Sequence, residues 1–212
     1  MPHNHQHHHN EGCGHESHDH GHDHGDVGSN DNLFPYIDRP NVVALNAIGL
    51  GSSVIKPWHE RTSEDVYLES DADEQLIIRV PFTGSVKLRS LLLKAGPGDQ
   101  TPEKIVLFAN ESSLDFNDVQ DKTSTQEFEV AEGRDVGEYA VKTAKFSNLS
   151  SVTLFIPCNR GADVTRVYYV GFLGHWTERR SNPVITVYEA QANLADHQKI
   201  QGTNSNFSTP QT

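Results

Sequence analysis

The stretch that decides the fold is ESDADEQLIIRVPFTGSVKLRSLLL, residues 69–93. Two apolar runs, 76–80 and 86–93, stand on either side of Pro81-Phe82-Thr83-Gly84. Proline and glycine between the runs oppose a helix, and short runs rich in β-branched residues and leucine are typical of buried strands. The stretch therefore predicts an acidic turn that leads into two adjacent strands joined by a second turn.

The rest of the chain repeats this alternation of short apolar runs and turn residues. Residues 95–99 (AGPGD) and 159–163 (NRGAD) supply glycines for positive φ, and the first also has a proline that fixes φ. Residues 33–46 contain two prolines and predict at most a short helical turn. Because capped helical periodicity is missing, the pattern predicts an all-β sandwich. The expected strands cover residues 76–81, 86–94, 104–109, 126–130, 140–146, 152–156, 166–173 and 184–188.

The length of 212 residues suits one domain with a sizeable core, which we expect at residues 31–197. Residues 1–30 hold ten of the 13 histidines and almost no large apolar side chain. Such a segment cannot offset its ordering entropy, so we expect it to be disordered. Residues 198–212 are rich in Gln, Asn, Ser and Thr and predict a second disordered tail.

Charge and hydropathy exclude several classes of partner. A formal net charge of −12 argues against nucleic acid, because binding to phosphates needs clustered Lys and Arg. Apolar runs fall short of the roughly twenty residues of a membrane span, and the N-terminus lacks the features of a secretory signal. Cys13 and Cys158 are too few for a disulfide framework. We therefore expect a soluble, intracellular protein, monomeric and without a membrane partner.

The histidine-rich segment is a candidate metal-binding tract. Neutral imidazole suits Zn, Ni and Cu(II), and a flexible tract can gather ligands without a preformed geometry, although the spacing of a dedicated zinc fold is missing. The alternative is a solvating tail whose charge rises as the pH falls toward about 6.5. We expect no required cofactor, only adventitious Zn or Ni on this tract. The tentative ligands are His3, His5, His7, His8, His9, His15, His18, His20, His22 and His24.

Two segments, 56–61 (KPWHER) and 174–180 (GHWTERR), echo one another through a Trp-x-Glu-Arg motif. An aromatic anchor beside an arginine is typical of protein-binding hot spots. The candidate binding residues are therefore Trp58, Arg61, Trp176 and Arg179. The alternative, which we favour, is that each Trp closes one edge of the sandwich and each Glu-Arg pair is a surface ion pair of small energetic value.

Residues 69–74 place four carboxylates within six positions, enough to suggest a calcium loop or an acid/base pair. The glycine, the terminal glutamate and the flanking helices of an EF-hand are missing, which favours a structural acidic turn.

The motifs of catalytic sites are also incomplete in this sequence. Residues 49–53 (GLGSS) lack the Lys-Ser/Thr ending of a phosphate loop, and no nucleophile elbow is found. Cys158 ends an apolar run and is expected to be a buried structural thiol. His59, His175 and His197 have no evident nucleophile beside them, so we expect no enzyme.

Several separated blocks resemble the PITH domain family, and the stand-alone members without a thioredoxin domain most of all. The resemblance covers about residues 33–195. The blocks are LFPYIDRPNVVALN (33–46), KPWHERT (56–62), residues 69–88, FSNLSSVTLFI (146–156), GADVTRVYYVGFLGHWTERR (161–180) and YEAQANLADHQ (188–198).

The resemblance implies a jelly-roll-like, galactose-binding-domain-like β-sandwich without catalytic activity. It also implies docking on the proteasome regulatory particle, as an adaptor in cytoplasm and nucleus. The reductase activity of thioredoxin-containing relatives does not transfer, since this chain has no C-x-x-C. The alternatives are a sandwich that binds a sugar or small polar ligand, with Trp58 or Trp176 stacked on the ring, and metal buffering by the histidine-rich segment.

Overall fold

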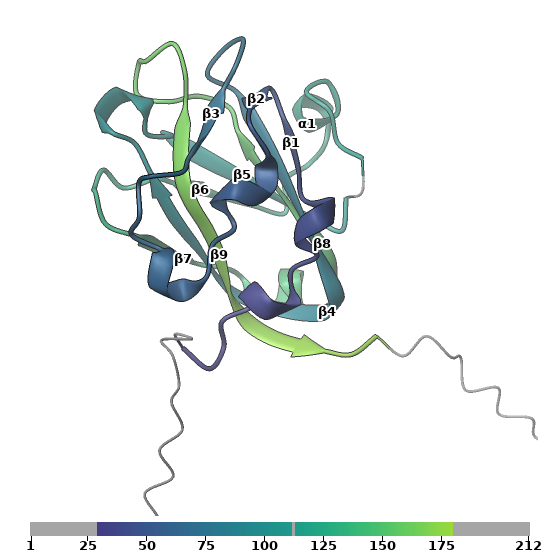
Figure 1. Cartoon of the computed structure of the whole chain (residues 1–212). Coiled ribbons are helices and arrows are strands. Elements are labelled where there is room, and N and C mark those ends of the chain that lie inside the picture. The colour runs from purple at the N-terminus through teal and green to yellow at the C-terminus, as the bar shows by residue number, and fades with distance from the viewer. Residues whose placement is uncertain (1–28, 112, 180–212) are drawn as a thin grey trace, which may run out of the picture. The chain divides into compact units, whose positions relative to one another are not determined.

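The structure, a computed structural model, describes residues 29–111 and 113–179 (Figure 1). In this range the regular structure is almost entirely antiparallel β-strand. The strands are β1 Val43–Leu45, β2 Ala47–Ile48, β3 Leu68–Ser70, β4 Leu76–Ala95, β5 Lys104–Ala109, β6 Gln126–Glu129, β7 Gly137–Ala140, β8 Leu149–Ile156 and β9 Arg166–Thr177. Helical turns are short: η1 Phe34–Tyr36, η2 Arg39–Asn41, η3 Gly51–Val54, η4 Trp58–Glu60, η5 Gly98–Gln100, α1 Asp118–Asp121 and η6 Thr143–Phe146.

The long strand β4 belongs to both layers of a sandwich. Its first half pairs with β1 and β8, and its second half pairs with β9 and β7, with a break in the β8 register between Pro81 and Val86. One layer therefore has the order β1-β4-β8-β5-β6, and the other has the order β2-β3-β9-β4-β7. Every pairing is antiparallel, so the expected all-β, jelly-roll-like sandwich is confirmed.

The expected turn at residues 81–84 is wrong. The chain does not reverse there, and the two apolar runs do not pair with each other. The first run pairs with β8, and the second pairs with β9, although Val86 also pairs with Leu149 of β8. Pro81 stays paired with Ser151, and its carbonyl accepts a hydrogen bond of 2.9 Å from the Asp38 amide. Gly84 lies under the Trp176 indole, where a side chain would collide. Proline and glycine here bend a continuous strand from one layer into the other.

Apolar side chains from both layers meet in one central core, and each layer also buries part of its outer face. The central core includes Ile78, Val80, Leu91, Leu107 and Phe172. On the outer face of the first layer, a smaller cluster forms around Ile77, Phe108 and Phe155, covered by Leu114 and Val119. On the outer face of the second layer, Leu92, Tyr169 and Leu173 form another, with Trp58 and Val136 packed against it.

Other elements differ from the sequence-based expectation at their boundaries. The expected strand 140–146 is wrong, because β7 ends at Ala140 and η6 occupies Thr143–Phe146. Residues 33–46 hold two short helical turns, where the sequence predicted at most one, and they also contain β1. The sequence did not predict β2, β3 or α1. The two glycine turns are confirmed by φ values of 115° at Gly96, 54° at Gly98 and 118° at Gly161. The expected strand 184–188 and the last part of the expected domain, residues 180–197, lie outside the described residues. Both expected tails also lie outside them, except for residues 29 and 30.

No helix within the described part of the chain is long and apolar enough to cross a membrane.

Candidate functional site

Trp58 and Arg61 hold η4 against the outer face of the second layer. The Arg61 guanidinium lies 4.3 Å from the centroid of the Trp58 ring, and its Nη1 donates a hydrogen bond of 2.8 Å to the Trp58 carbonyl. Trp58 packs against the outer cluster that contains Tyr169. Burial raises the pKa of Tyr169 to about 12, and the nearby charge of Arg61 opposes this rise. One face of the Trp58 ring is thus occupied by Arg61.

Trp176 packs against the central core instead. Its ring stacks on Tyr36 with the centroids 4.5 Å apart and the planes inclined by 9°, and it packs against the core between the layers. The indole Nε1 is buried and has no hydrogen-bond partner among the residues that the structure describes. Arg179 is exposed at the end of the described range.

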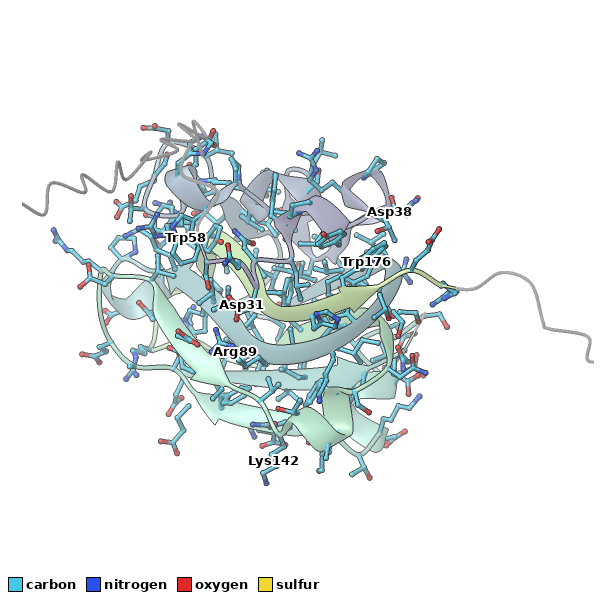
Figure 2. All side chains as sticks on the ribbon, turned by 90° about the horizontal axis from the view of Figure 1, so that it is seen from below. Asp31, Asp38, Trp58, Arg89, Lys142 and Trp176 are labelled. Carbon is cyan, nitrogen blue, oxygen red and sulfur yellow. The ribbon has the colours of Figure 1, made fainter. Side chains whose placement is uncertain are left out.

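The structure does not bring the four candidate binding residues together. Trp58 and Trp176 lie apart in Figure 2 and pack against different apolar clusters on opposite sides of the β9 layer. The two Trp-x-Glu-Arg segments are therefore similar in sequence but not part of one site. As binding residues, and as a sugar platform, they stay predictions.

The acidic turn at residues 69–74 is organised by Asn46, which has a φ of 55°. Its Nδ2 donates to Asp73 Oδ1 at 2.7 Å and to the Gln75 carbonyl at 2.6 Å, while its Oδ1 accepts from the Ala72 amide at 2.9 Å. Within residues 29–111 and 113–179, no group of three or more His, Cys, Asp or Glu side chains could hold a metal ion. The hydrogen bonds support a structural role for this turn.

The ten candidate histidine ligands, His3 to His24, lie outside the described residues. Metal binding by this segment stays a prediction, which zinc titration of the full chain and of a chain lacking residues 1–30 can check.

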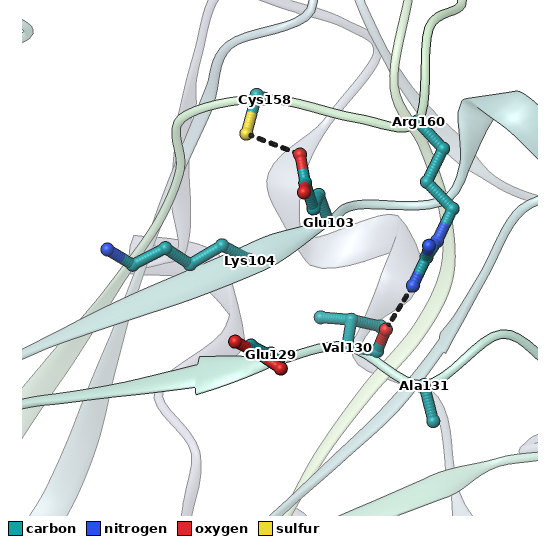
Figure 3. A pocket seen from close by; sticks show the side chains of 7 residues that line it. All are labelled: Glu103, Lys104, Glu129, Val130, Ala131, Cys158 and Arg160. Atoms are coloured by element: carbon teal, nitrogen blue, oxygen red, sulfur yellow. Dashed lines mark hydrogen bonds between the residues drawn. The ribbon is translucent and has the colours of Figure 1, made fainter.

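Cys158 lines a cavity of about 700 Å³ together with Glu103, Lys104, Glu129 and Arg160 (Figure 3). The thiol is only partly buried, so the expectation of a buried cysteine is wrong. Its Sγ lies 3.6 Å from Glu103 Oε2. Burial, followed by the hydrogen bond and the charge of Glu103, raises the pKa of the thiol. Since the thiolate is the reactive form, this cysteine is poorly suited to nucleophilic chemistry.

The two cations of this cavity already have partners. Arg160 Nη2 donates to the Val130 carbonyl at 2.7 Å, and its Nη1 lies 3.0 Å from Glu132. Lys104 pairs with Glu127. The cavity therefore offers no uncommitted cation to an anionic ligand.

Asp31, Arg89 and Glu138 form an ionic cluster that sequence reasoning missed, and Figure 2 labels its Asp31 and Arg89. Arg89 Nη2 lies 2.6 Å from Asp31, and its Nη1 lies 3.0 Å from Glu138. Burial opposes ionisation of Asp31, but hydrogen bonds from Ser29 and Arg89 hold the pKa of its carboxyl below the usual value. The cluster ties the start of the described chain to β4 and β7. Its members are far apart in sequence, so no local signal could have indicated it.

A second missed feature is an exposed apolar surface beside β2 and β3, which we call the β2–β3 patch and define as Ile48, Leu50, Val66 and Tyr67. These side chains are 57%, 75%, 50% and 43% exposed, respectively. Arg166 lies 4.3 Å from the centroid of the Tyr67 ring, and Tyr168 contacts the same ring edge-on at 6.1 Å. The alternation in Ala47-Ile48-Gly49-Leu50 hints at a strand, but sequence alone could not show that its apolar face is uncovered.

Solved structures with a similar strand arrangement include a family 32 carbohydrate-binding module of Clostridium perfringens in complex with galactose. It has 11% identity and a TM-score of 0.47, over 65% of this chain and 96% of that one. A fucolectin from striped bass, Morone saxatilis, has 14% identity and a TM-score of 0.48, over 69% of this chain and 49% of that one. What these proteins bind is a property of theirs.

Comparisons of sequence give matches of higher identity that cover more of the chain. The profile of the PITH domain matches residues 23–192. A PITH domain-containing protein of Drosophila melanogaster is 39% identical over 203 residues, which cover 94% of this chain and 95% of that protein. PITH domain-containing protein 1 of Homo sapiens is 40% identical over 177 residues, which cover 81% of this chain and 82% of that protein. Neither is named as an enzyme. The resemblance noted in the sequence is confirmed: the chain belongs to the PITH domain family.

Proposed function

We propose that this protein is a non-catalytic interaction module that acts as an adaptor on the proteasome regulatory particle, in cytoplasm and nucleus. The resemblance to the PITH family implies this partner. The observation that carries the proposal is the β2–β3 patch, in which four large apolar side chains stay exposed on a well-packed sandwich. Large apolar side chains that stay exposed close together in a fold are typical of a protein-binding site.

The remaining features of the described chain agree with binding better than with catalysis. The pKa of Cys158 is raised by burial, and the acidic turn is bonded to Asn46. Trp58 and Trp176 each have one ring face covered, by Arg61 and by Tyr36. These side chains stabilise the sandwich and leave the β2–β3 patch as the best candidate for contact with a partner.

The test is direct binding of the full chain to purified regulatory particle. We expect co-sedimentation with a dissociation constant in the range of about 0.1–10 μM, as is common for regulatory contacts of modest area. The Ile48→Ser, Leu50→Ser double variant should bind about tenfold more weakly or worse, because removal of central apolar contacts costs at least that much.

The double variant must melt within a few degrees of the unchanged protein, since both side chains are exposed. A Trp58→Ala variant serves as a comparison that alters a packed aromatic outside the patch. The proposal is abandoned if the unchanged chain shows no co-sedimentation with the particle at micromolar concentration.

A further inference from the structure

Members of the β2–β3 patch lie on the outer side of the β2–β3 pair. β2 and β3 pair with Ala47 opposite Ser70 and Ile48 opposite Glu69, and the pairing ends there, because Gly49 has a φ of 107°. Residues that lie opposite one another in an antiparallel pair point to the same side of the sheet. Leu68 and Ser70 point to the other side, and both are fully buried. Ile48 and Tyr67 therefore share one solvent-facing side, and Leu50, two residues after Ile48, is the most exposed member of the patch.

Carboxylates surround this face. Residues 60–74 carry seven Asp and Glu but a single basic residue, Arg61. Asp65 precedes Val66 at one end of the patch, and Asp71 follows β3 at the other end, where Asp73 also lies. All three are exposed.

The nearby cations are already engaged. Arg166 is hydrogen-bonded to Glu69 at 2.8 Å, and Lys94, whose side chain is only 6% exposed, pairs with Glu64 at 2.9 Å. Lys56 is buried and donates to the Ser63 and Val66 carbonyls at 3.1 and 2.6 Å. Lys56 also interacts electrostatically with Glu60 and Asp65. The seven carboxylates of residues 60–74 still outnumber the four cations Arg61, Lys56, Lys94 and Arg166, so the rim of the patch presents an excess of negative charge to a partner.

The backbone at this edge limits how a partner can bind. β2 has two residues, bounded by Asn46 with a φ of 55° and Gly49 with a φ of 107°. A strand added to β2 could form only a very short ladder, since the positive-φ residues turn the backbone away on both sides. Contact must come mainly from side chains that pack on Ile48, Leu50 and Tyr67.

A second copy of this chain is a poor occupant. In a two-fold interface each patch would face its own image, so Asp65 and Asp71 would meet the same acidic rim. The net charge of −12 adds to this repulsion.

We propose that the β2–β3 patch binds an apolar protein segment flanked by lysine or arginine, with the apolar residues on Ile48, Leu50 and Tyr67 and the basic residues against Asp65 and Asp71. This rests on the proposed function and names the surface and the partner chemistry that serve it. Apolar contact supplies most of the affinity, and charge supplies orientation and the rate of association.

The experiment places a photo-crosslinking residue in the full chain, Leu50→p-benzoylphenylalanine, since Leu50 is the most exposed member of the patch. The crosslinker is activated in cell extract and, separately, with purified regulatory particle, and the attached peptides are sequenced by mass spectrometry. A second chain carries the crosslinker at Asp121, which is exposed in α1 outside the patch.

We expect adducts on a segment that combines apolar residues with adjacent Lys or Arg. Adding Asp71→Lys should reduce their yield about fivefold at 50 mM salt and much less at 500 mM, because salt screens exposed charges. The matched reversal Asp121→Lys should leave the yield unchanged.

Adducts on a second copy of the chain, on an acidic segment, or only at the level of the Asp121 crosslinker overturn the inference. An adduct yield that is the same with and without Asp71→Lys also overturns it. Adducts on a basic apolar segment of a protein outside the proteasome keep this inference and refute the proteasome proposal. If purified particle retains the chain but gives no adducts at Leu50, the proteasome proposal stands and this inference is refuted.

Discussion

The indole of Trp176 lies directly on Gly84, so that a Cβ on this glycine would come within 2.7 Å of Trp176 Cε2 and 2.5 Å of the Thr177 carbonyl. This contact lets β4 pass from one layer to the other beneath β9. It is the kind of close approach that only glycine allows.

Gly84→Ala should therefore lower the free energy of unfolding by about 1–3 kcal/mol, because the methyl group must displace the indole or the strand. Urea denaturation measures the change. Gly133→Ala is the matched control, since the nearest atom to its added Cβ is 4.0 Å away and its effect should stay within about 0.5 kcal/mol. If Gly84→Ala costs as much in a Trp176→Phe background as alone, the indole is not the cause, and the clash lies with the Thr177 carbonyl.

Two substitutions of Asn46 can separate the energetic effect of its φ of 55° from that of its side-chain hydrogen bonds. Asn46→Gly keeps the backbone conformation and loses the hydrogen bonds to the acidic turn, whereas Asn46→Ala loses both. We expect Asn46→Ala to destabilise the protein by about 2–3 kcal/mol and Asn46→Gly by about 1 kcal/mol less. Equal losses in thermal and urea unfolding would show that the backbone conformation contributes nothing.

The Asp31–Arg89 pair predicts a pH dependence. The pKa of Asp31 is lowered in the folded protein, so the pair stabilises the fold above the ordinary carboxyl pKa, near 3.8, and this stabilisation is lost as the pH falls through the lower, folded value. Asp31→Asn should cost up to about 1 kcal/mol at pH 7, a modest value because the pair is partly exposed. The difference between the two proteins should shrink below pH 4 in urea titrations. A constant difference from pH 7 to pH 3 would contradict the assignment.

Cys158 should react slowly with a thiol reagent such as a disulfide dye at pH 7.5, because burial and Glu103 raise its pKa. Glu103→Gln should speed the reaction several-fold, since it removes the negative charge that favours the protonated thiol and leaves only a neutral amide beside it. Glu129→Gln is the matched control, since Glu129 lines the same cavity and has no hydrogen bond to the thiol. A Cys13→Ser background isolates Cys158. Equal rates for the two glutamine variants would remove Glu103 as a cause.

The sequence predicted the fold class well wherever the signal is local. Gly96, Gly98 and Gly161 adopt the positive φ values that their turns require, and the apolar runs that begin at Leu76, Lys104 and Arg166 all form strands. Pro81 to Gly84 was misread because the same residues favour a turn and a bend. What decides between them here is distant in sequence: the Asp38 amide on the Pro81 carbonyl and the Trp176 ring on Gly84.

The candidate site was less predictable for the same reason. Trp58 and Trp176 look equivalent in sequence, but one packs on an outer face and the other on the central core. Leu50 and Leu88 are both leucines in apolar surroundings, but one is 75% exposed and the other fully buried. Exposure of this kind depends on which segments cover each face, and no short pattern records that.

The double membership of β4 has a consequence for how the protein opens. Its 20 residues are the inner strand of both layers, so neither layer can separate from the other without losing its own central hydrogen bonds. Amide hydrogens of Ile78 in one layer and Leu91 in the other should then exchange with solvent in the same opening event, at the free energy of global unfolding. Two sheets joined in this way behave as a single cooperative unit.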